Sequence, residues 1–312
     1  MSQIKIIIQE KIYIFILISI FIYFKIKKYF INRNKHEISD YKIFEVNFEY
    51  HKYERQMITE KIHRYSNWEL VNEEPYFING IIRKYKPKKC LEIGVAYGGS
   101  SIVILNAIKD IKDSFLVSLD LNNNVYTGEK VKTGYNANKY FPELTNKWKL
   151  FTGEQPNKFL DALNLKFSFL YLDTTHATPG ELINIIEALP FLEDNAIIIL
   201  HGIMTHLPSY RPLNKNYKFF PSQIYLMTSL IGDKVVIENK STGLENIGAI
   251  HLFPDQEKYY LNYFLLLLSH WEYMPSENQI KDLRLFIRKY YKKDIFLNIF
   301  NTAVNNNKYL FL

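Results

Sequence analysis

The stretch CLEIGVAYGGSS, residues 90–101, joins a short apolar run to three glycines and a carboxylate. An apolar run that ends in Gly94, Gly98 and Gly99 is typical of a buried strand that turns sharply into a helix. Because glycine has no side chain, such a turn lets the main chain come close to a ligand. A turn whose glycines serve packing alone is the alternative interpretation.

The spacing of these glycines differs from that of a dinucleotide site. The pattern G-x-G-x-x-G places its middle glycine where this chain has Ala96. That glycine admits a pyrophosphate to the helix N-terminus, so its absence disfavours a nicotinamide dehydrogenase. Such a dehydrogenase on a similar sheet remains an alternative class of function.

Apolar runs and helical patterns alternate on both sides of the opening stretch. The predicted strands are 88–94, 114–121, 147–153, 167–173 and 195–200, and the predicted helices are 75–85, 99–110, 157–163, 179–192 and 220–231. Two later strands, 234–238 and 247–253, are joined by a short turn and must therefore pair in antiparallel fashion. We predict an α/β fold of the Rossmann-like, doubly wound kind, with a mostly parallel seven-stranded sheet and an antiparallel edge hairpin.

Five motifs, in this order, resemble the class I S-adenosylmethionine-dependent methyltransferases. They are LEIGVAYGGSS (91–101), SLD (118–120), FTGEQ (151–155), LYLDTTH (170–176) and IIILHG (197–202). The first motif together with D-x-x-H also resembles a branch with cephalosporin-hydroxylase-like proteins and small-molecule or sugar methyltransferases. The resemblance implies an enzyme that binds S-adenosylmethionine beyond the carboxyl ends of the strands.

Six residues are expected at the cofactor. They are Glu92, Gly94, Gly98, Ser100, Asp120 and Glu154. The resemblance implies that Glu92 faces the methionine part and that Glu154 lies beside the adenine. Asp120 also has an argument of its own, because a carboxylate at a strand end can accept hydrogen bonds from both ribose hydroxyls. A turn or helix-capping aspartate is the alternative for Asp120.

Three further residues are expected at the reacting end of the site. Asp173 and His176 follow the fourth predicted strand, and His201 ends the fifth. Methyl transfer is a displacement at an already activated carbon, so the protein mainly positions the acceptor and can remove its proton. Histidine titrates in the range that this task requires. Imidazoles bonded only to the backbone are the alternative.

The residue after His201 departs from the resembled pattern. Relatives often carry His-Asp where this chain has His201 and Gly202, so a possible ligand for a divalent ion is missing. Asp173 and the two histidines could still bind a metal, and divalent metal binding is therefore left open.

The chain begins with an apolar segment, IYIFILISIFIYF, at residues 12–24. It is short for a spanning helix unless Lys11 and Lys25 extend along it toward water. The basic residues that follow predict a membrane-anchored protein with its main domain in the cytoplasm. Whether the helix spans the membrane or lies on it stays open, and packing on the protein or a partner is the alternative. The predicted parts are the anchor 1–33, a helical linker or cap 34–74, the methyltransferase-like domain 75–254 and a helical extension 255–312.

Composition limits the remaining possibilities. The 312 residues are 47% hydrophobic and 23% charged, enough for one substantial core with an appendage. The only cysteine, Cys90, cannot form an internal disulfide. Of the net charge of +7, the first 40 residues supply +4, and the +3 left elsewhere predicts no nucleic-acid partner. The extension is predicted as apolar helices at 255–274 and 275–306, a lid or the surface of a homo-oligomer.

The sequence therefore predicts a membrane-tethered S-adenosylmethionine-dependent methyltransferase. The acceptor is expected to be a small molecule, a sugar or a lipid-linked compound, methylated on oxygen in preference to nitrogen. A non-catalytic cofactor-binding or scaffold protein is the alternative, and Gly202 is the feature in its favour.

Overall fold

Seven strands form one sheet in the computed structural model, which describes residues 61–66, 70, 73–126, 130–203, 222–239 and 244–308. The strands are β1 (Lys89–Ile93), β2 (Phe115–Asp120), β3 (Trp148–Thr152), β4 (Phe167–Leu172), β5 (Leu192–His201), β6 (Gly232–Asn239) and β7 (Leu244–Leu252). Their order is β3-β2-β1-β4-β5-β7-β6. The first five are parallel, whereas β7 is antiparallel to both β5 and β6. The predicted sheet is confirmed; the predicted N-terminal hydrophobic helix lies outside the described residues.

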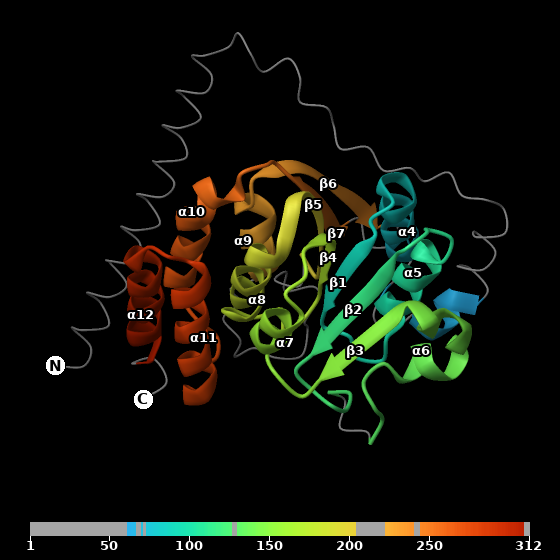
Figure 1. The fold of residues 1–312 in the computed structure, drawn as a ribbon, viewed down its shortest axis with the longest axis horizontal. Coiled ribbons are helices and arrows are strands. Elements are labelled where there is room, and N and C mark those ends of the chain that lie inside the picture. Colours follow the sequence, from blue (N-terminus) through green and yellow to red (C-terminus); the bar gives the residue numbers. More distant parts are fainter. Residues whose placement is uncertain are drawn as a thin grey trace, which may run out of the picture. The chain divides into compact units, whose positions relative to one another are not determined.

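The strand order reverses at β1, and this reversal fixes where a ligand can bind. β1 pairs with β2 on one side and with β4 on the other, so Ile93 lies between Leu119 and Leu172. The helices that follow β1 and β4 leave toward opposite faces of the sheet (Figure 1). A crevice forms at such a switch point, outside the carboxyl ends of the strands.

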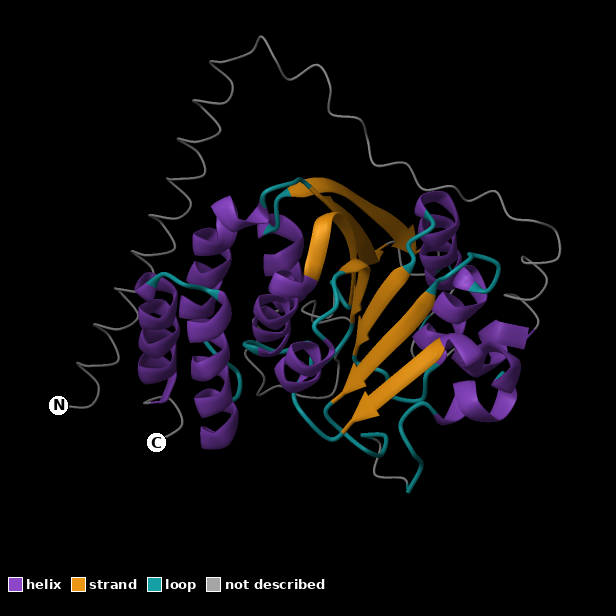
Figure 2. Cartoon of the chain, viewed as in Figure 1, coloured by secondary structure: helices purple, strands orange, loops and turns teal. Residues whose placement is uncertain are grey.

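Helices cover both faces of the sheet, as Figures 1 and 2 show. One layer holds α3 (His63–Ser66), α4 (Glu74–Tyr85), α5 (Gly99–Ile108), α6 (Tyr135–Tyr140) and the 3-10 turn η2 (Pro142–Lys147). The other holds α7 (Pro156–Leu163), α8 (Gly180–Ala188), η3 (Leu189–Phe191), α9 (Ser222–Ser229) and the C-terminal helices. Alternating strand residues separate the two apolar cores, since Leu91 belongs to the α8 side and Cys90 to the α5 side.

The C-terminal extension packs on the α7 and α8 side of the sheet (Figure 1). Its elements are η5 (Gln256–Tyr259), α10 (Tyr260–Leu265), η6 (Leu266–Leu268), α11 (Glu277–Tyr290) and α12 (Asp294–Lys308). The predicted single helix 255–274 is therefore broken into short pieces, and the predicted helix 275–306 is divided in two. The predicted capping box is present, because the Ser276 hydroxyl accepts from the N–H of Gln279 and the Gln279 side chain accepts from the N–H of Ser276.

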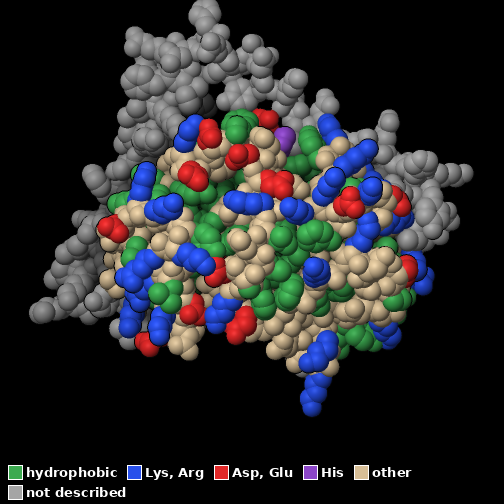
Figure 3. Space-filling model, viewed as in Figure 1, with side chains coloured by type: hydrophobic (Ala, Val, Ile, Leu, Met, Phe, Trp, Pro, Cys, Tyr) green, Lys and Arg blue, Asp and Glu red, His purple; other side chains and the backbone are tan. Residues whose placement is uncertain are grey.

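The predicted anchor 1–33 lies outside the described residues. Within the described part of the chain, none of the helices has the length and apolar character needed to cross a membrane. Lys, Arg, Asp and Glu side chains are interspersed over the face drawn in Figure 3. Such mixing matches the small charge surplus that the sequence assigns to residues after the first 40.

Candidate active site

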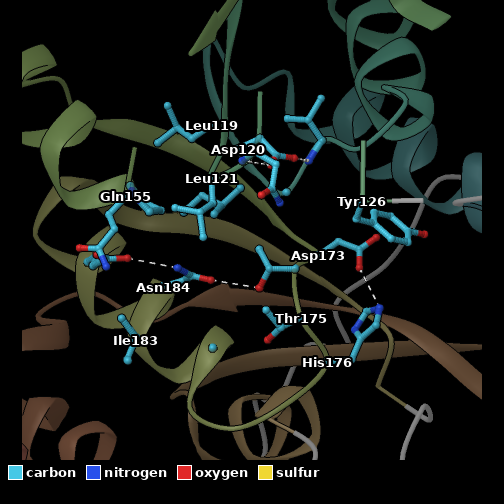
Figure 4. A pocket seen from close by; sticks show the side chains of 18 of the residues that line it. Leu119, Asp120, Leu121, Tyr126, Gln155, Asp173, Thr175, His176, Ile183 and Asn184 are labelled. Atoms are coloured by element: carbon cyan, nitrogen blue, oxygen red, sulfur yellow. Dashed lines mark hydrogen bonds and ion pairs between the residues drawn. The ribbon is translucent and has the colours of Figure 1, made fainter. Parts of the chain in front are cut away.

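A cavity of about 810 Å³ opens at the carboxyl ends of the parallel strands, within the usual size range of ligand pockets. Its walls include the loop after β1, the ends of β2 and β4, the start of α7, one face of α8 and part of α11. Seven of the nine residues predicted for the site fall into two groups: Gly94, Ser100, Asp120, Asp173, His176 and His201 line the cavity, and Gly98 lies in the loop beside it. Figure 4 shows Asp120 on one side of this space and Asp173 with His176 on another.

Gly94 brings the loop after β1 against the end of β4. Its φ is +92°, and a Cβ there would lie 1.8 Å from the carbonyl oxygen of Asp173. The N–H of Asp173 also donates to the carbonyl of Ile93 at 3.0 Å. Only glycine permits so close an approach with this backbone conformation. The glycine loop and the predicted catalytic aspartate are therefore adjacent.

Asp120 holds the same loop from the β2 side. Its Oδ2 accepts hydrogen bonds from the N–H groups of Val95 at 2.9 Å and Ala96 at 3.1 Å. Its Oδ1 accepts from the N–H of Asn122 at 2.8 Å. Each carboxylate oxygen can accept more than one hydrogen bond, so Asp120 can shape the loop and still receive a hydroxyl from the cavity.

Glu92 is fully buried beneath the loop and does not line the cavity. Its carboxyl accepts from the hydroxyls of Ser100 and Ser101, both at 2.6 Å, and of Ser118 at 2.5 Å. Burial raises the pKa of Glu92 to about 7, although the three serine hydroxyls act to lower it. The structure thus places Glu92 and Ser100 in a polar cluster that fixes the start of α5 to β1 and β2.

Gln155, which the sequence analysis missed, lines the cavity beyond β3 in place of Glu154. The Glu154 carboxylate is exposed and pairs with Lys158 at 2.9 Å. Gln155 is 9% exposed and its Oε1 has no hydrogen-bond partner. Both residues belong to the turn that precedes α7, so the motif located the turn but not the side chain that faces the cavity.

Asp173 and His201 form a hydrogen-bonded pair at the ends of β4 and β5. The Nδ1 of His201 lies 2.8 Å from Oδ2 of Asp173, and its Nε2 lies 3.1 Å from Oε2 of Glu74. Glu74 is the first residue of α4 and is 2% exposed. Its other oxygen accepts from Nδ2 of Asn246 on β7 at 3.0 Å. Four elements therefore meet at one imidazole.

The two carboxylates favour the protonated form of His201. Burial alone would lower the pKa of this imidazole, but the charges of Asp173 and Glu74 raise it well above its ordinary value. Burial likewise acts to raise the pKa of Asp173, and the neighbouring His201 charge brings it below its usual range. An imidazolium with both N–H groups donated to carboxylates has no lone pair with which to accept a proton.

His176 lies across Asp173 from His201 and is more accessible. Its Nε2 is 3.3 Å from Oδ1 of Asp173, and its Nδ1 is 2.6 Å from Nε2 of Gln223 on α9. His176 has a φ of +55°, and Gly202 one of +81°. A Cβ at Gly202 would lie 2.3 Å from the His176 ring. The imidazole therefore occupies the space into which a side chain at position 202 would project.

Asp173, His176 and His201 also form a possible metal-binding group. One ligand atom from each lies within 4.8 Å of the others. One carboxylate and two imidazoles suit a divalent transition metal. These three residues can hold such a metal if it replaces the proton between Nδ1 of His201 and the carboxylate of Asp173.

Glu74, Asn246 and Gln223 were not identified from the sequence. Each contacts a residue that is remote in the chain. Glu74 is 127 residues and Asn246 is 45 residues from His201, and Gln223 is 47 residues from His176. Glu74 is marked only as an acid in the first turn of a helix, which is ordinary capping chemistry.

The fold is of the Rossmann-like α/β kind, with a ligand-sized cavity at the carboxyl ends of its parallel strands. Residues 91–203 match the family model described as a methyltransferase domain. No curated protein matches the chain significantly. Over these residues the chain is similar to a methyltransferase domain, in agreement with the resemblance to the class I S-adenosylmethionine-dependent methyltransferases.

Solved structures with a similar fold include two O-methyltransferases. One, from Bacillus cereus and solved with S-adenosylhomocysteine, is 14% identical over 62% of this chain and 89% of that chain, with a TM-score of 0.46. Another, TomG from Streptomyces achromogenes and solved with S-adenosylmethionine, is 14% identical over 65% of this chain and 91% of that chain, with a TM-score of 0.44.

Proposed function

We propose that this protein transfers a methyl group from S-adenosylmethionine to an oxygen of a small-molecule, sugar or lipid-linked acceptor. One observation carries the proposal: a single cavity is lined by the glycine loop, by Asp120 and by the cluster of Asp173, His176 and His201. The loop and Asp120 suit the cofactor, whereas the cluster suits proton removal from an acceptor. A scaffold protein that only binds the cofactor would not require the second group.

The strand order supports an extended pose for the cofactor. Gln155 follows β3, Asp120 ends β2, the glycine loop follows β1 and Asp173 follows β4, and these strands are consecutive neighbours. Neighbouring strands lie about 4.8 Å apart, so the four tips span about 14 Å. In this pose the ribose meets Asp120, the methionine part meets the glycine loop, and the methyl group faces Asp173.

The chemical step needs a positioned acceptor and a proton acceptor. A bond forms between the acceptor oxygen and the methyl carbon while the carbon–sulfur bond breaks, and its electron pair stays on sulfur to give S-adenosylhomocysteine. The hydroxyl proton passes to Nδ1 of His176, the imidazole with the greater exposure and only one carboxylate neighbour, once the acceptor takes the place of Gln223 Nε2 at that nitrogen. His201 holds Asp173 in place and is not assigned the proton, because both its nitrogens face carboxylate oxygens.

The charges of the cluster also favour a cationic cofactor. Glu74 and Asp173 contribute two negative charges, and His201 contributes one positive charge, which leaves a net negative charge beside the reacting carbon. A sulfonium is attracted to such a site and its neutral product is not. The negative charge of the cluster therefore does not hold S-adenosylhomocysteine in the site, which favours its release.

Calorimetry with the full chain tests the proposal. S-adenosylmethionine and S-adenosylhomocysteine are expected to bind, and NAD is not. Asp120→Ala should weaken S-adenosylhomocysteine binding by about 1.5–3 kcal/mol, the scale of a hydrogen bond to a charged group. Transfer of label from methyl-labelled cofactor to a panel of hydroxylated acceptors then separates an enzyme from a scaffold. Binding of NAD alone would support the dehydrogenase alternative.

A divalent cation at Asp173, His176 and His201 is a second possibility, favoured by the closeness of their ligand atoms. When bound, a metal would supply Lewis-acid activation of the acceptor oxygen. These three side chains would hold it, and Glu74 would retain its contact with the other nitrogen of His201. Loss of turnover in chelator, restored by a divalent ion and accompanied by ion binding in calorimetry, would assign the cluster to a metal.

The proposal includes attachment to a membrane through residues 12–24 and the lysines that follow them. The support is the apolar character of this segment and its basic flank. Attachment would place the domain beside lipid-linked acceptors on the cytoplasmic side.

A further inference from the structure

One wall of the cavity lies outside the residues that match the methyltransferase domain. It belongs to the C-terminal extension, which contributes Tyr273, Met274, Pro275, Gln279 and Leu283. All five residues follow the matched range 91–203. Tyr273 is the one residue among them with a hydroxyl group, and the reaction proposed above does not use it. The extension therefore brings a polar group of its own to the cavity.

Hydrogen bonds fix the extension against the loop after β4 and against α8. The Thr178 hydroxyl donates to the carbonyl of His270 at 2.6 Å, and the N–H of Glu272 donates to the carbonyl of Thr178 at 2.9 Å. The Tyr291 hydroxyl donates to the carbonyl of Ile186 on α8 at 2.6 Å. The segment before α11 is therefore held next to the loop that follows β4.

Two hydroxyls meet at Gly180, the first residue of α8. A Cβ at this position would lie 2.1 Å from Oγ1 of Thr175 and 3.0 Å from the hydroxyl oxygen of Tyr273. The backbone of Gly180 does not have a positive φ, and glycine is a poor helix former. The space that the two hydroxyls occupy therefore accounts for glycine at the start of this helix.

The environment of Tyr273 suits an uncharged polar ligand group. Burial, followed by the charge of Glu181, raises the pKa of Tyr273 to about 12, while a hydrogen bond with Thr175 opposes the rise and the charge of Glu187 adds to it. The phenol therefore keeps its proton at neutral pH and can both donate and accept. The carboxylates of Glu181 and Asp173 disfavour an anion nearby. An ammonium only donates, so a hydroxyl matches this pair of hydroxyls better.

The hydroxyl pair lies at the reacting end of the cavity. Thr175 directly precedes His176 in the chain, and both line the cavity together with Asp173. Figure 4 shows Thr175 and His176 on one side of the space and Asp120 on the other. An acceptor whose reacting oxygen meets His176 therefore has its neighbouring atoms close to Thr175 and Tyr273. Hydroxyls on two adjacent carbons suit these two places.

We propose that Thr175 and Tyr273 bind a second, uncharged hydroxyl of the acceptor, on the carbon next to the one whose oxygen is methylated. The inference rests on the proposed function, which places the methyl group at Asp173 and the proton acceptor at His176. The acceptor is then a neutral vicinal diol, and its second hydroxyl keeps its proton throughout. Tyr273 is a specificity-determining residue that the C-terminal extension supplies.

The test measures methyl transfer by the full chain from methyl-labelled S-adenosylmethionine to two matched pairs of probes. They are cis-1,2-cyclohexanediol with cyclohexanol, and catechol with phenol, so that a saturated and an aromatic diol are distinguished. In at least one pair the diol should exceed the mono-ol in kcat/KM by about tenfold or more. Tyr273→Phe and Thr175→Val should each reduce this preference to about threefold or less. The loss should fall mainly on KM, because the second hydroxyl is bound but not altered in the reaction.

Matched controls come from positions that do not line the cavity. Tyr259→Phe in η5 and Thr302→Val, at an exposed position of α12, should keep the wild-type preference. Calorimetry with S-adenosylhomocysteine checks that each variant is folded, and Thr175→Val, at an exposed position, serves if Tyr273→Phe does not fold.

Several outcomes would overturn the inference. They are equal transfer to diol and mono-ol, transfer to neither by a protein that binds cofactor, and a preference that both variants retain. Faster transfer to cis-2-aminocyclohexanol than to the diol would show that the pair receives an amine instead. A diol preference that chelator removes and Tyr273→Phe leaves intact would assign diol binding to a metal. A wild type that does not bind S-adenosylhomocysteine would instead overturn the proposed function.

Discussion

At the residue scale, the His176 ring fills the space that a side chain at position 202 would need. This overlap explains why the chain has Gly202 where the resembled family often has aspartate. The sequence interpretation takes Gly202 as a lost carboxylate and as evidence for a scaffold protein. In the structure a side chain at this position would overlap the imidazole of His176, and the φ of +81° favours glycine independently. Glycine at position 202 therefore leaves the room that the His176 ring needs to lie beside Asp173.

Gly202→Ala is expected to destabilise the protein by at least about 1–3 kcal/mol and to displace His176. In a His176→Ala background the same substitution should cost less by about 0.5 kcal/mol or more, because the overlapping ring is gone. Denaturant unfolding of the four proteins in this cycle measures the difference. Additive costs would show that the two residues do not compete for space.

His201→Gln tests whether the imidazole of His201 is charged. The raised pKa of His201 stabilises the folded state. This stabilisation is complete at pH values below the pKa of the unfolded state, and it is lost as the pH rises through the pKa of the folded state. The lowered pKa of Asp173 adds stability that is present above its ordinary value and is lost as pH falls. The wild type should therefore exceed the variant by about 3–5 kcal/mol between these limits. The gap should narrow at alkaline pH; a gap independent of pH would contradict a charged His201.

Helix α4 contributes to the site although it precedes the matched domain. Its first residue, Glu74, reaches His201 on β5 and Asn246 on β7. The sequence predicted this helix at 75–85, and its extent agrees with Glu74–Tyr85. Its role could not be predicted, because periodicity identifies which face is buried but not which distant partner a buried acid will meet.

Glu74→Gln should lower the pKa of His201, since one of two neighbouring negative charges is removed while the side chain keeps its shape. The alkaline loss of stability should then begin at lower pH than in the wild type. Thermal unfolding across the pH range, or titration of the His201 ring by NMR, measures the shift. Glu193→Gln, at an exposed acid on β5, is the control. An unchanged titration would remove Glu74 from this role.

Helix α11 begins at a capping box and forms part of the cavity wall. The capping box at Ser276 and Gln279 was predicted, because it depends on residues three apart. Ser276→Ala should cost about 0.5–2 kcal/mol of unfolding free energy, and Ser276→Gly only a few tenths. Chemical denaturation separates the two variants. Equal costs would mean that the cap does not hold the start of α11.

At the scale of the whole molecule, the sheet was predictable and much of the surroundings was not. The parallel strands are short, mostly apolar runs bounded by turn residues, which is a local signal. The apolar stretch 255–274 carries an equally strong local signal, yet it forms η5, α10 and η6. Its tertiary contacts decide the outcome, since the N–H of Trp271 donates to Asn307 at 2.8 Å instead of continuing a helix. The same limit hid Gln223 and Asn246, whose partners lie far along the chain.

The whole chain is expected to divide its tasks between an anchor and a domain that binds cofactor independently. In the proposed attachment residues 12–24 and their basic flank supply apolar area and charge, while the cavity is lined by residues between 93 and 283. Full-length protein should sediment with membranes and resist extraction by high salt, because burial of apolar side chains is not screened by ions. A chain beginning at Asn34 should stay in the supernatant and bind S-adenosylhomocysteine with wild-type affinity.

Replacing Ile16 and Phe21 by Ser should weaken sedimentation, whereas replacing Tyr13 and Tyr23 by Phe should not. Release of the full-length protein by salt alone would indicate electrostatic attachment, and loss of cofactor binding in the shortened chain would show that the two parts are not independent.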